Sequence, residues 1–157
     1  MKKQLLSILA ASAFLSSMAQ IATFSNQTAL LPTTTYSSGN SIAVCDMNGD
    51  FKDDIVRTDN TDMSICYQGI PNGAFTETVF PYSDPQGNTG LDSPWGMCVG
   101  DFNNDGFNDV LWGEGSSVRM MKWNGVDYTG ECVSTSTGAG YIFVQGSNFF
   151  DINNDGW

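Results

Sequence analysis

Short apolar runs alternate with polar turns along residues 41–134. The runs are rich in β-branched and aromatic side chains and are bounded by Gly, Asn, Asp or Pro, which is typical of strands. They form two groups of four: 41–45, 54–58, 63–68 and 74–80, then 96–100, 109–113, 118–123 and 128–134. The dipeptides Asn72-Gly73 and Asn124-Gly125 favour tight hairpins inside these groups. No segment beyond the first twenty residues keeps a long apolar period of 3.6 residues, so the sequence predicts an all-β fold.

An acidic motif follows the first run of each group and occurs a third time near the end of the chain. Residues 46–54 read DMNGDFKDD, residues 101–109 read DFNNDGFND, and residues 151–157 read DINNDGW. All three keep Asp-x-Asn-x-Asp, and the first two also keep an Asp at the ninth position. Each motif follows an apolar run, the third of which is 147–150. Four strands in a repeat of about 50 residues predict the blades of a β-propeller.

The repeat gives approximate boundaries. Blade one is expected at about 40–82, blade two at about 94–134, and the start of blade three at 141–157. The segment 22–39 is interpreted as the outer strand of a preceding blade. A propeller closes with about four or more blades. The sequence therefore predicts an incomplete propeller and, from its end inside a third motif, an N-terminal fragment of a longer protein.

The first nineteen residues have the layout of a secretory signal peptide. MKKQ is basic, LLSILAASAFL is apolar, and Ser17-Met18-Ala19 offers a small-x-small cleavage site. The apolar run is too short to span a bilayer comfortably. We therefore expect residues 1–19 to be removed, residues 20–157 to form the repeat region, and the mature chain to be secreted or held at the cell surface.

Charge and residue content exclude several functions. The formal net charge is −11, with six basic residues and no histidine among 157 residues. A nucleic-acid-binding surface and histidine-dependent catalysis are therefore not expected. Four cysteines, Cys45, Cys66, Cys98 and Cys132, match no zinc spacing. In an exported chain they allow three disulfide pairings, but buried free thiols are slightly favoured because each lies in an apolar stretch.

The acidic motif has the chemistry of a calcium loop. Calcium takes about six to eight oxygen ligands from carboxylates, amides and carbonyls. Alternate side chains at positions one, three and five converge, position seven would offer its carbonyl, and the Asp at position nine would close the far side. The predicted calcium ligands are Asp46, Asn48, Asp50, Lys52, Asp54, Asp101, Asn103, Asp105, Phe107, Asp109, Asp151, Asn153 and Asp155.

Other cations and loops fit less well. Magnesium demands a tighter octahedron, and zinc prefers nitrogen or sulfur ligands. An EF-hand needs a Glu at position twelve, where this chain has Arg57 or Trp112. Gly106 permits a positive φ at position six, but the first loop has Phe51 there. Either Gly49 takes up the bend in the first loop, or that loop is a weaker site.

At these residues the chain resembles the FG-GAP/VCBS repeat family, whose members are calcium-loop β-propellers related to the integrin α-subunit head. The resemblance is carried by AVCDMNGDFKDDIV, GMCVGDFNNDGFNDVLW and FFDINNDGW and covers about residues 23–157. It implies blades around a central axis, calcium loops between the first and second strands of each blade, and ligand binding by loops on one face.

Three functions are compatible with this resemblance. The first is a non-catalytic calcium-binding module for adhesion to an extracellular protein or glycan. The second is part of a secreted enzyme acting on polysaccharides, and the third is a structural spacer for a downstream domain. The chain groups no catalytic residues, which favours the first. Tyr82, Trp95 and Trp123 are candidates for stacking on sugars, although packing between blades explains such aromatics equally well.

Overall fold

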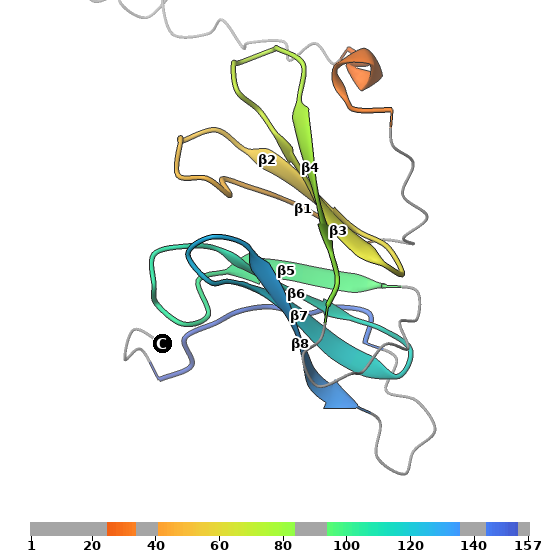
Figure 1. Cartoon of the computed structure of the whole chain (residues 1–157), viewed down its shortest axis with the longest axis vertical. Helices are drawn as coiled ribbons and strands as arrows, with labels where there is room; N and C mark the ends of the chain where they lie inside the picture. The colour runs from red at the N-terminus through yellow and green to blue at the C-terminus, as the bar shows by residue number, and fades with distance from the viewer. Residues whose placement is uncertain (1–24, 34–40, 84–93, 136–143, 154–157) are drawn as a thin grey trace, which may run out of the picture.

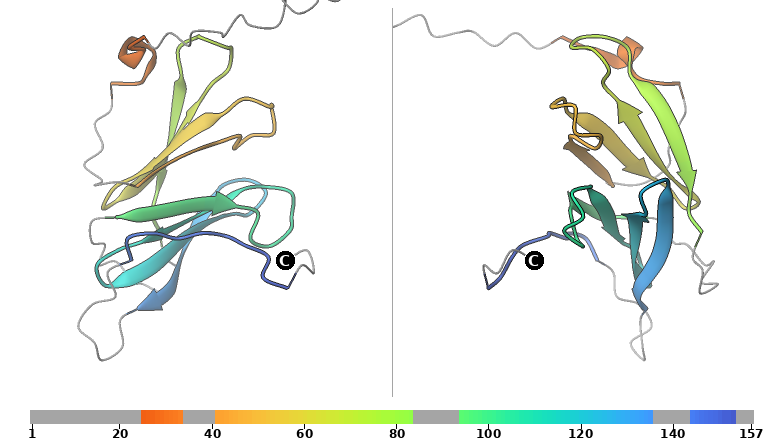
Figure 2. Two further views of the ribbon diagram at one scale, coloured as in Figure 1. Left: turned by 180° about the vertical axis from the view of Figure 1, so that it is seen from behind. Right: turned by 60° about the vertical axis from the view of Figure 1, so that its left-hand side comes forward.

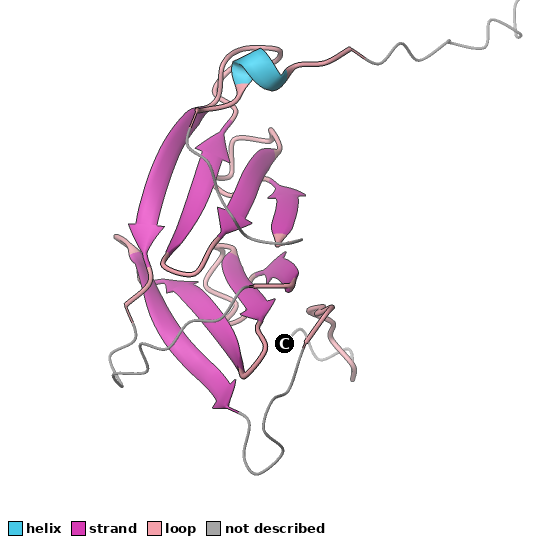
Figure 3. Ribbon diagram, turned by 90° about the vertical axis from the view of Figure 1, so that its right-hand side faces the viewer, coloured by secondary structure: helices cyan, strands magenta, loops and turns pink. Residues whose placement is uncertain are grey.

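The computed structural model describes residues 25–33, 41–83, 94–135 and 144–153. Eight strands form two antiparallel sheets of four, in the orders β1-β2-β3-β4 and β5-β6-β7-β8 (Figures 1 and 3). The first sheet holds β1 (Ile42–Cys45), β2 (Asp54–Thr58), β3 (Asp62–Tyr67) and β4 (Thr76–Pro81). The second holds β5 (Gly96–Gly100), β6 (Asp109–Gly113), β7 (Ser117–Trp123) and β8 (Tyr128–Thr135). The predicted all-β fold with four-stranded antiparallel blades is confirmed.

Alternation along the strands places one face of each sheet in a shared core. In β2 the side chains of Asp54, Val56 and Thr58 are buried, while the residues between them are only half-buried. The shared core consists of Met47, Val56, Met63, Ile65, Val110, Trp112, Met121 and Tyr128. Because both sheets contribute to one cluster, the two blades pack face to face, as neighbouring blades of a propeller do.

The outer face of the second sheet is partly covered by the segment 144–150. Gly96, Gly100 and Gly113 allow this approach, since a Cβ at each would lie 2.2–2.8 Å from atoms of that segment. Figure 2 shows the segment running beside β5. The predicted strand at 147–150 is wrong, because these residues form no ladder among the described residues; Val144 N–H only donates to the Glu114 carbonyl at 3.2 Å.

The segment before the first blade also differs from its prediction. Within the described part, 25–33, the chain forms the short 3₁₀ helix η1 (Thr28–Leu30) instead of an outer strand. The Asn26 side chain accepts the Thr28 N–H at 2.9 Å, and this local bond competes with an extended ladder. The Leu30 carbonyl accepts the Phe75 N–H at 2.8 Å and so ties η1 to the loop before β4. The signal peptide prediction lies outside the described residues.

All four cysteines are described, and all are free thiols. Cys66 is fully buried, and burial raises the pKa of its thiol. Burial, reinforced by Asp54, raises the pKa of Cys45 to about 11. Of the four thiols expected to be buried, Cys66 is buried, and Cys45, Cys98 and Cys132 are half-buried. Among the described residues there is also no helix with the length and apolar character needed to cross a bilayer.

Candidate metal centre

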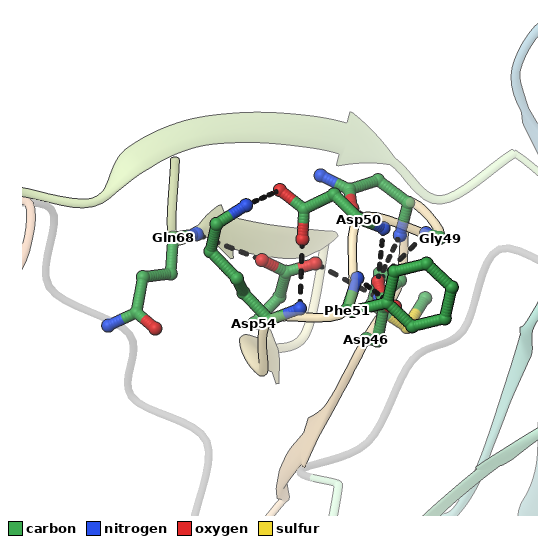
Figure 4. Close-up of polar contacts among 9 residues, drawn as sticks. Asp46, Gly49, Asp50, Phe51, Asp54 and Gln68 are labelled. Carbon is green, nitrogen blue, oxygen red and sulfur yellow. Dashed lines mark hydrogen bonds and ion pairs between the residues drawn. The ribbon is translucent and has the colours of Figure 1, made fainter. Parts of the chain in front are cut away.

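The first acidic loop joins β1 to β2 and closes around the carboxylate of Asp46 (Figure 4). The two oxygens of this carboxylate accept four backbone N–H groups at 2.7–3.3 Å, those of Asn48, Gly49, Asp50 and Phe51. Partial desolvation disfavours the charged form, but these N–H groups outweigh it and lower the pKa of Asp46. The Asp46 side chain is therefore held as an anion at the centre of the loop.

The side chains at positions three and five continue the same pattern. Asn48 Oδ1 accepts the Asp50 N–H at 3.0 Å, and Asp50 Oδ1 accepts the Lys52 N–H at 3.0 Å. Each short polar side chain thus bonds the backbone two residues further on, which is the Asx-turn preference of Asp and Asn. The Asp46 and Asn48 oxygens meet at the Asp50 N–H, while the Asp50 carboxylate turns to Lys52.

The second loop, between β5 and β6, repeats this arrangement. Asp101 accepts the Asp105 N–H at 3.0 Å and the Gly106 N–H at 2.8 Å. Asn103 Oδ1 accepts the Asp105 N–H at 3.1 Å, and Asp105 Oδ1 accepts the Phe107 N–H at 2.9 Å. Two stretches with different intervening residues therefore adopt one hydrogen-bonding pattern.

The backbone dihedrals of the two loops also match. Positions four and six have positive φ in both loops: 75° at Gly49 and 64° at Phe51, then 54° at Asn104 and 89° at Gly106. The glycine has changed places, at position four in the first loop and position six in the second. Gly49 therefore does not take up the bend in place of Phe51: Gly49 turns at position four, as Asn104 does, and Phe51 itself has the positive φ at position six. Asn tolerates this region, whereas Phe is strained there.

Phe51→Gly is expected to stabilise the chain by about 1 kcal/mol. A residue with a Cβ in the left-handed region costs the folded state roughly 1–2 kcal/mol. Glycine removes this cost, but its greater freedom in the unfolded chain cancels part of the gain. The ring is 97% exposed, so its loss removes almost no packing. Chemical denaturation measures the change in the free energy of unfolding.

The control for this strain is Phe51→Ala, which removes the ring but keeps the Cβ. It should leave the free energy of unfolding within about 0.5 kcal/mol of the starting chain. An equal gain from alanine and glycine would show that the exposed ring, and not the backbone conformation, was unfavourable.

The aspartates at position nine are fully buried and hold two segments each. Asp54 accepts the Met47 N–H at 3.0 Å and the Gln68 N–H at 2.9 Å, which joins the first loop to the end of β3 (Figure 4). Asp109 accepts the Phe102 N–H at 3.0 Å and the Trp123 N–H at 2.9 Å, which joins the second loop to the end of β7. Burial raises the pKa of Asp109, although these two hydrogen bonds favour the ionised form and act in the opposite direction.

Lys52 distinguishes the first loop from the second. Its ammonium nitrogen lies 2.7 Å from Asp50 Oδ2, a carboxylate predicted to hold calcium. The corresponding residue of the second loop is Phe107, whose side chain carries no ammonium group. The first loop therefore carries an internal cation that competes for one of its ligands.

The two loops are also bonded to each other. Asn108 Nδ2 donates to the Asp46 carbonyl at 2.8 Å, and the Tyr128 hydroxyl donates to the Asn108 carbonyl at 2.9 Å. Asn108 stands at position eight, where the motif shows no preference, so this link had no signal in the sequence. It places the two loops side by side at one end of the blades (Figure 1).

Donor chemistry and geometry can now be compared with the prediction. The side chains at positions one, three and five all offer oxygen atoms. In both loops, the oxygens of positions one and three accept the same N–H, that of position five, while the position-five carboxylate accepts the N–H of position seven. Within the described ranges, however, no three carboxylate or thiol groups converge as a ready-made metal cluster. In the third motif, Asp151 and Asn153 are described, and Asp155 lies outside the described residues.

These features define a class of protein: an all-β repeat protein of propeller-type blades, with an acidic loop between the first and second strands of each blade. A family model described as FG-GAP-like repeat matches residues 46–112, and one described as FG-GAP repeat matches residues 93–144. The chain belongs to the FG-GAP repeat family, which confirms the resemblance carried by its loops. Neither curated proteins nor solved structures gave a match.

Proposed function

We propose that the chain is a calcium-stabilised, non-catalytic binding module that acts outside the cell. The observation that carries the proposal is the shared conformation of the two acidic loops. Both turn at positions four and six, and in both the oxygens of positions one and three meet at the N–H of position five. An all-oxygen donor set on a flexible loop suits calcium better than magnesium or zinc.

Calcium would offset the repulsion among the aspartates of each loop. In the second loop, Asp101, Asn103 and Asp105 would hold the ion together with the Phe107 carbonyl and Asp109. The first loop would use the corresponding residues, with Lys52 weakening its affinity by pairing with Asp50. The first and second strands of each blade are joined by these loops, so the ion would stabilise the blade. The predicted signal peptide supports export to an environment rich in calcium.

The ion pairs of the glutamates favour binding over catalysis. The chain has three glutamates, and each forms an ion pair: Glu77 with Arg57, Glu114 with Arg119, and Glu131 with Lys122. Hydrolysis of polysaccharides commonly needs two free carboxyl groups facing one site. Of the candidates for stacking on sugars, Tyr82 already packs edge-on against Trp112, with ring centroids 5.6 Å apart.

Calcium is expected to raise the melting temperature of the chain by several degrees. A ligand at 100 times its dissociation constant stabilises a fold by about 2.7 kcal/mol, and about 1 kcal/mol shifts Tm by roughly 2–4 °C in a domain of this size. Asp105→Ala should remove most of the gain, because it deletes a central ligand of the stronger loop. Scanning calorimetry with calcium and with a chelator measures both effects.

The matched control is Asp127→Ala, which removes one carboxylate from an exposed turn outside the loops. It should retain the full calcium response, and magnesium at the same concentration should give a much smaller one. The proposal fails if the unmodified chain melts at the same temperature with calcium and with chelator.

A further inference from the structure

A small aromatic pocket lies where the two blades meet, beside the acidic loops. Its volume is about 180 Å³, and six residues line it: Met47, Asn48, Tyr67, Phe107, Trp123 and Tyr128. Pockets for drug-sized molecules occupy roughly 300–1,000 Å³, so this one suits a small head group. A neighbouring hollow of about 360 Å³ shares Met47, Asn48 and Phe107 and extends between the loops to Asp46.

Aromatic rings from both blades form the walls of this aromatic pocket. The ring centroids of Phe107 and Trp123 are 6.0 Å apart at an angle of 41°, and those of Trp123 and Tyr128 are 5.1 Å apart at 62°. Phe107 is 50% exposed, which leaves its ring open to a ligand. Tyr67 adds a fourth ring from the first blade. Rings inclined to one another in this way offer π faces and edges from several directions.

The surroundings of the aromatic pocket are negative. No Lys or Arg lines either hollow, while the Asp46 carboxylate lines the larger one. Burial raises the pKa of Tyr67, and the charge of Asp54 raises it further. The pKa of Tyr128 is raised in the same way, with Asp109 among the contributors. An anionic field beside aromatic faces disfavours anions and attracts cations.

We propose that the aromatic pocket binds a small organic cation, such as a quaternary ammonium group. Aromatic faces attract such cations through their quadrupoles, and in the calcium-free chain the neighbouring carboxylates add a long-range attraction. The guanidinium of an arginine side chain shares this chemistry and is the other source of such a group. The inference rests on the proposed function as a binding module and names the class of ligand it would take.

Titration with tetramethylammonium chloride tests the proposal on the full chain. The ¹H–¹⁵N signal of the Trp123 indole is the reporter, because Trp123 Nε1 has no hydrogen-bond partner among the described residues. A saturable shift is expected with tetramethylammonium and not with sodium chloride at equal ionic strength. N-acetylarginine amide is titrated in parallel. A response to either cation supports the proposal, and the stronger response identifies the source.

Two variants and one neutral ligand complete the test. Phe107→Leu keeps the apolar bulk but removes the π face, so it should weaken binding by about fivefold or more. Phe102→Leu is the matched control, since Phe102 stands in the same loop, is 51% exposed and packs against Phe149 outside the pocket. It should bind as the unmodified chain does.

Methyl glucoside is the neutral ligand. The proposal would be overturned by absence of saturation with both cations, by equal loss of binding in both variants, or by saturation with methyl glucoside alone. Calcium-dependent melting is measured on the same samples, so a failure of the calcium loops is seen separately.

Discussion

Asp109→Ala is expected to lower the free energy of unfolding by about 2–4 kcal/mol. The carboxylate is fully buried, and it accepts the Phe102 and Trp123 N–H groups at 3.0 and 2.9 Å. Alanine leaves both donors without an acceptor in a buried place, and each such loss costs about 1–3 kcal/mol. Removing a desolvated charge offsets part of this cost, because burial disfavours the ionised form and raises the pKa of Asp109. Urea denaturation in the presence of a chelator measures the effect without any contribution from calcium.

The equivalent residue of the first blade provides an internal replicate. Asp54 is also fully buried and holds the Met47 and Gln68 N–H groups, so Asp54→Ala should cost a similar amount. Asp53→Ala is the matched surface control, since Asp53 is the exposed neighbour of Asp54. It should change the free energy of unfolding by less than about 0.5 kcal/mol. If Asp109→Ala cost no more than Asp53→Ala, the ninth-position carboxylate would not hold the blade together.

The strands and the acidic loops were predictable because their signals are local. Alternating apolar positions such as Val56 and Thr58 determine which face of a strand is buried, and Asn124-Gly125 marks a hairpin. The loop pattern follows from Asx turns, each of which spans only two residues. The repeat strengthens the prediction of the loops, because the same pattern occurs in two separate stretches of the chain.

Features that depend on distant residues were not predictable in the same way. The partners of the Asp54 and Asp109 carboxylates include Gln68 and Trp123, each fourteen residues further along the chain. Asn108 reaches a carbonyl 62 residues away. The sequence identified position nine as an acidic position but gave no sign that its oxygens accept N–H groups from two segments.

Two errors have a common physical cause. The runs around Leu30 and at 147–150 carry apolar residues of the kind found in strands, yet neither forms a strand. A strand requires a neighbouring ladder, and the described residues offer none at either place. Apolar content predicts burial against a neighbour, as Phe149 packs on Gly100, but it does not provide a hydrogen-bonding partner.

Glu114→Ala is expected to lower the free energy of unfolding by about 3–5 kcal/mol, the usual cost of leaving one member of a buried ion pair alone. Glu114 is fully buried and Arg119 is 3% exposed. Glu114 accepts the Trp112 indole N–H at 3.1 Å, the Ser117 hydroxyl at 2.5 Å and Arg119 Nε at 3.3 Å. Alanine would therefore leave the Trp112 indole N–H and the Ser117 hydroxyl without this acceptor. It would also remove the carboxylate beside the Arg119 guanidinium, whose Nε keeps its hydrogen bond to the Ser117 hydroxyl oxygen at 2.8 Å.

Arg119 also connects this cluster to the chain that follows the first blade. Its Nη1 donates to the Tyr82 hydroxyl at 3.3 Å, and its guanidinium carbon lies 5.5 Å from the centre of the Tyr82 ring. Burial opposes the charge of Arg119, but the Tyr82 hydroxyl and the Glu114 carboxylate outweigh it and raise the pKa of Arg119. The guanidinium stays charged, so loss of Glu114 removes the carboxylate that pairs with this buried cation between the blades.

A double-mutant cycle separates this electrostatic effect from lost packing. Glu114→Gln keeps the shape and one acceptor but removes the charge, and Arg119→Met removes the cation while keeping an apolar stem. The double variant should be more stable than the sum of the single losses predicts, by about 1–3 kcal/mol. Additivity within about 0.5 kcal/mol would show that the two groups act independently.

The first blade supplies a comparison, because Arg57 and Glu77 form a more exposed pair at 2.6 Å, with side chains 15% and 10% exposed. Water compensates part of any loss there, so Glu77→Ala should cost less than Glu114→Ala.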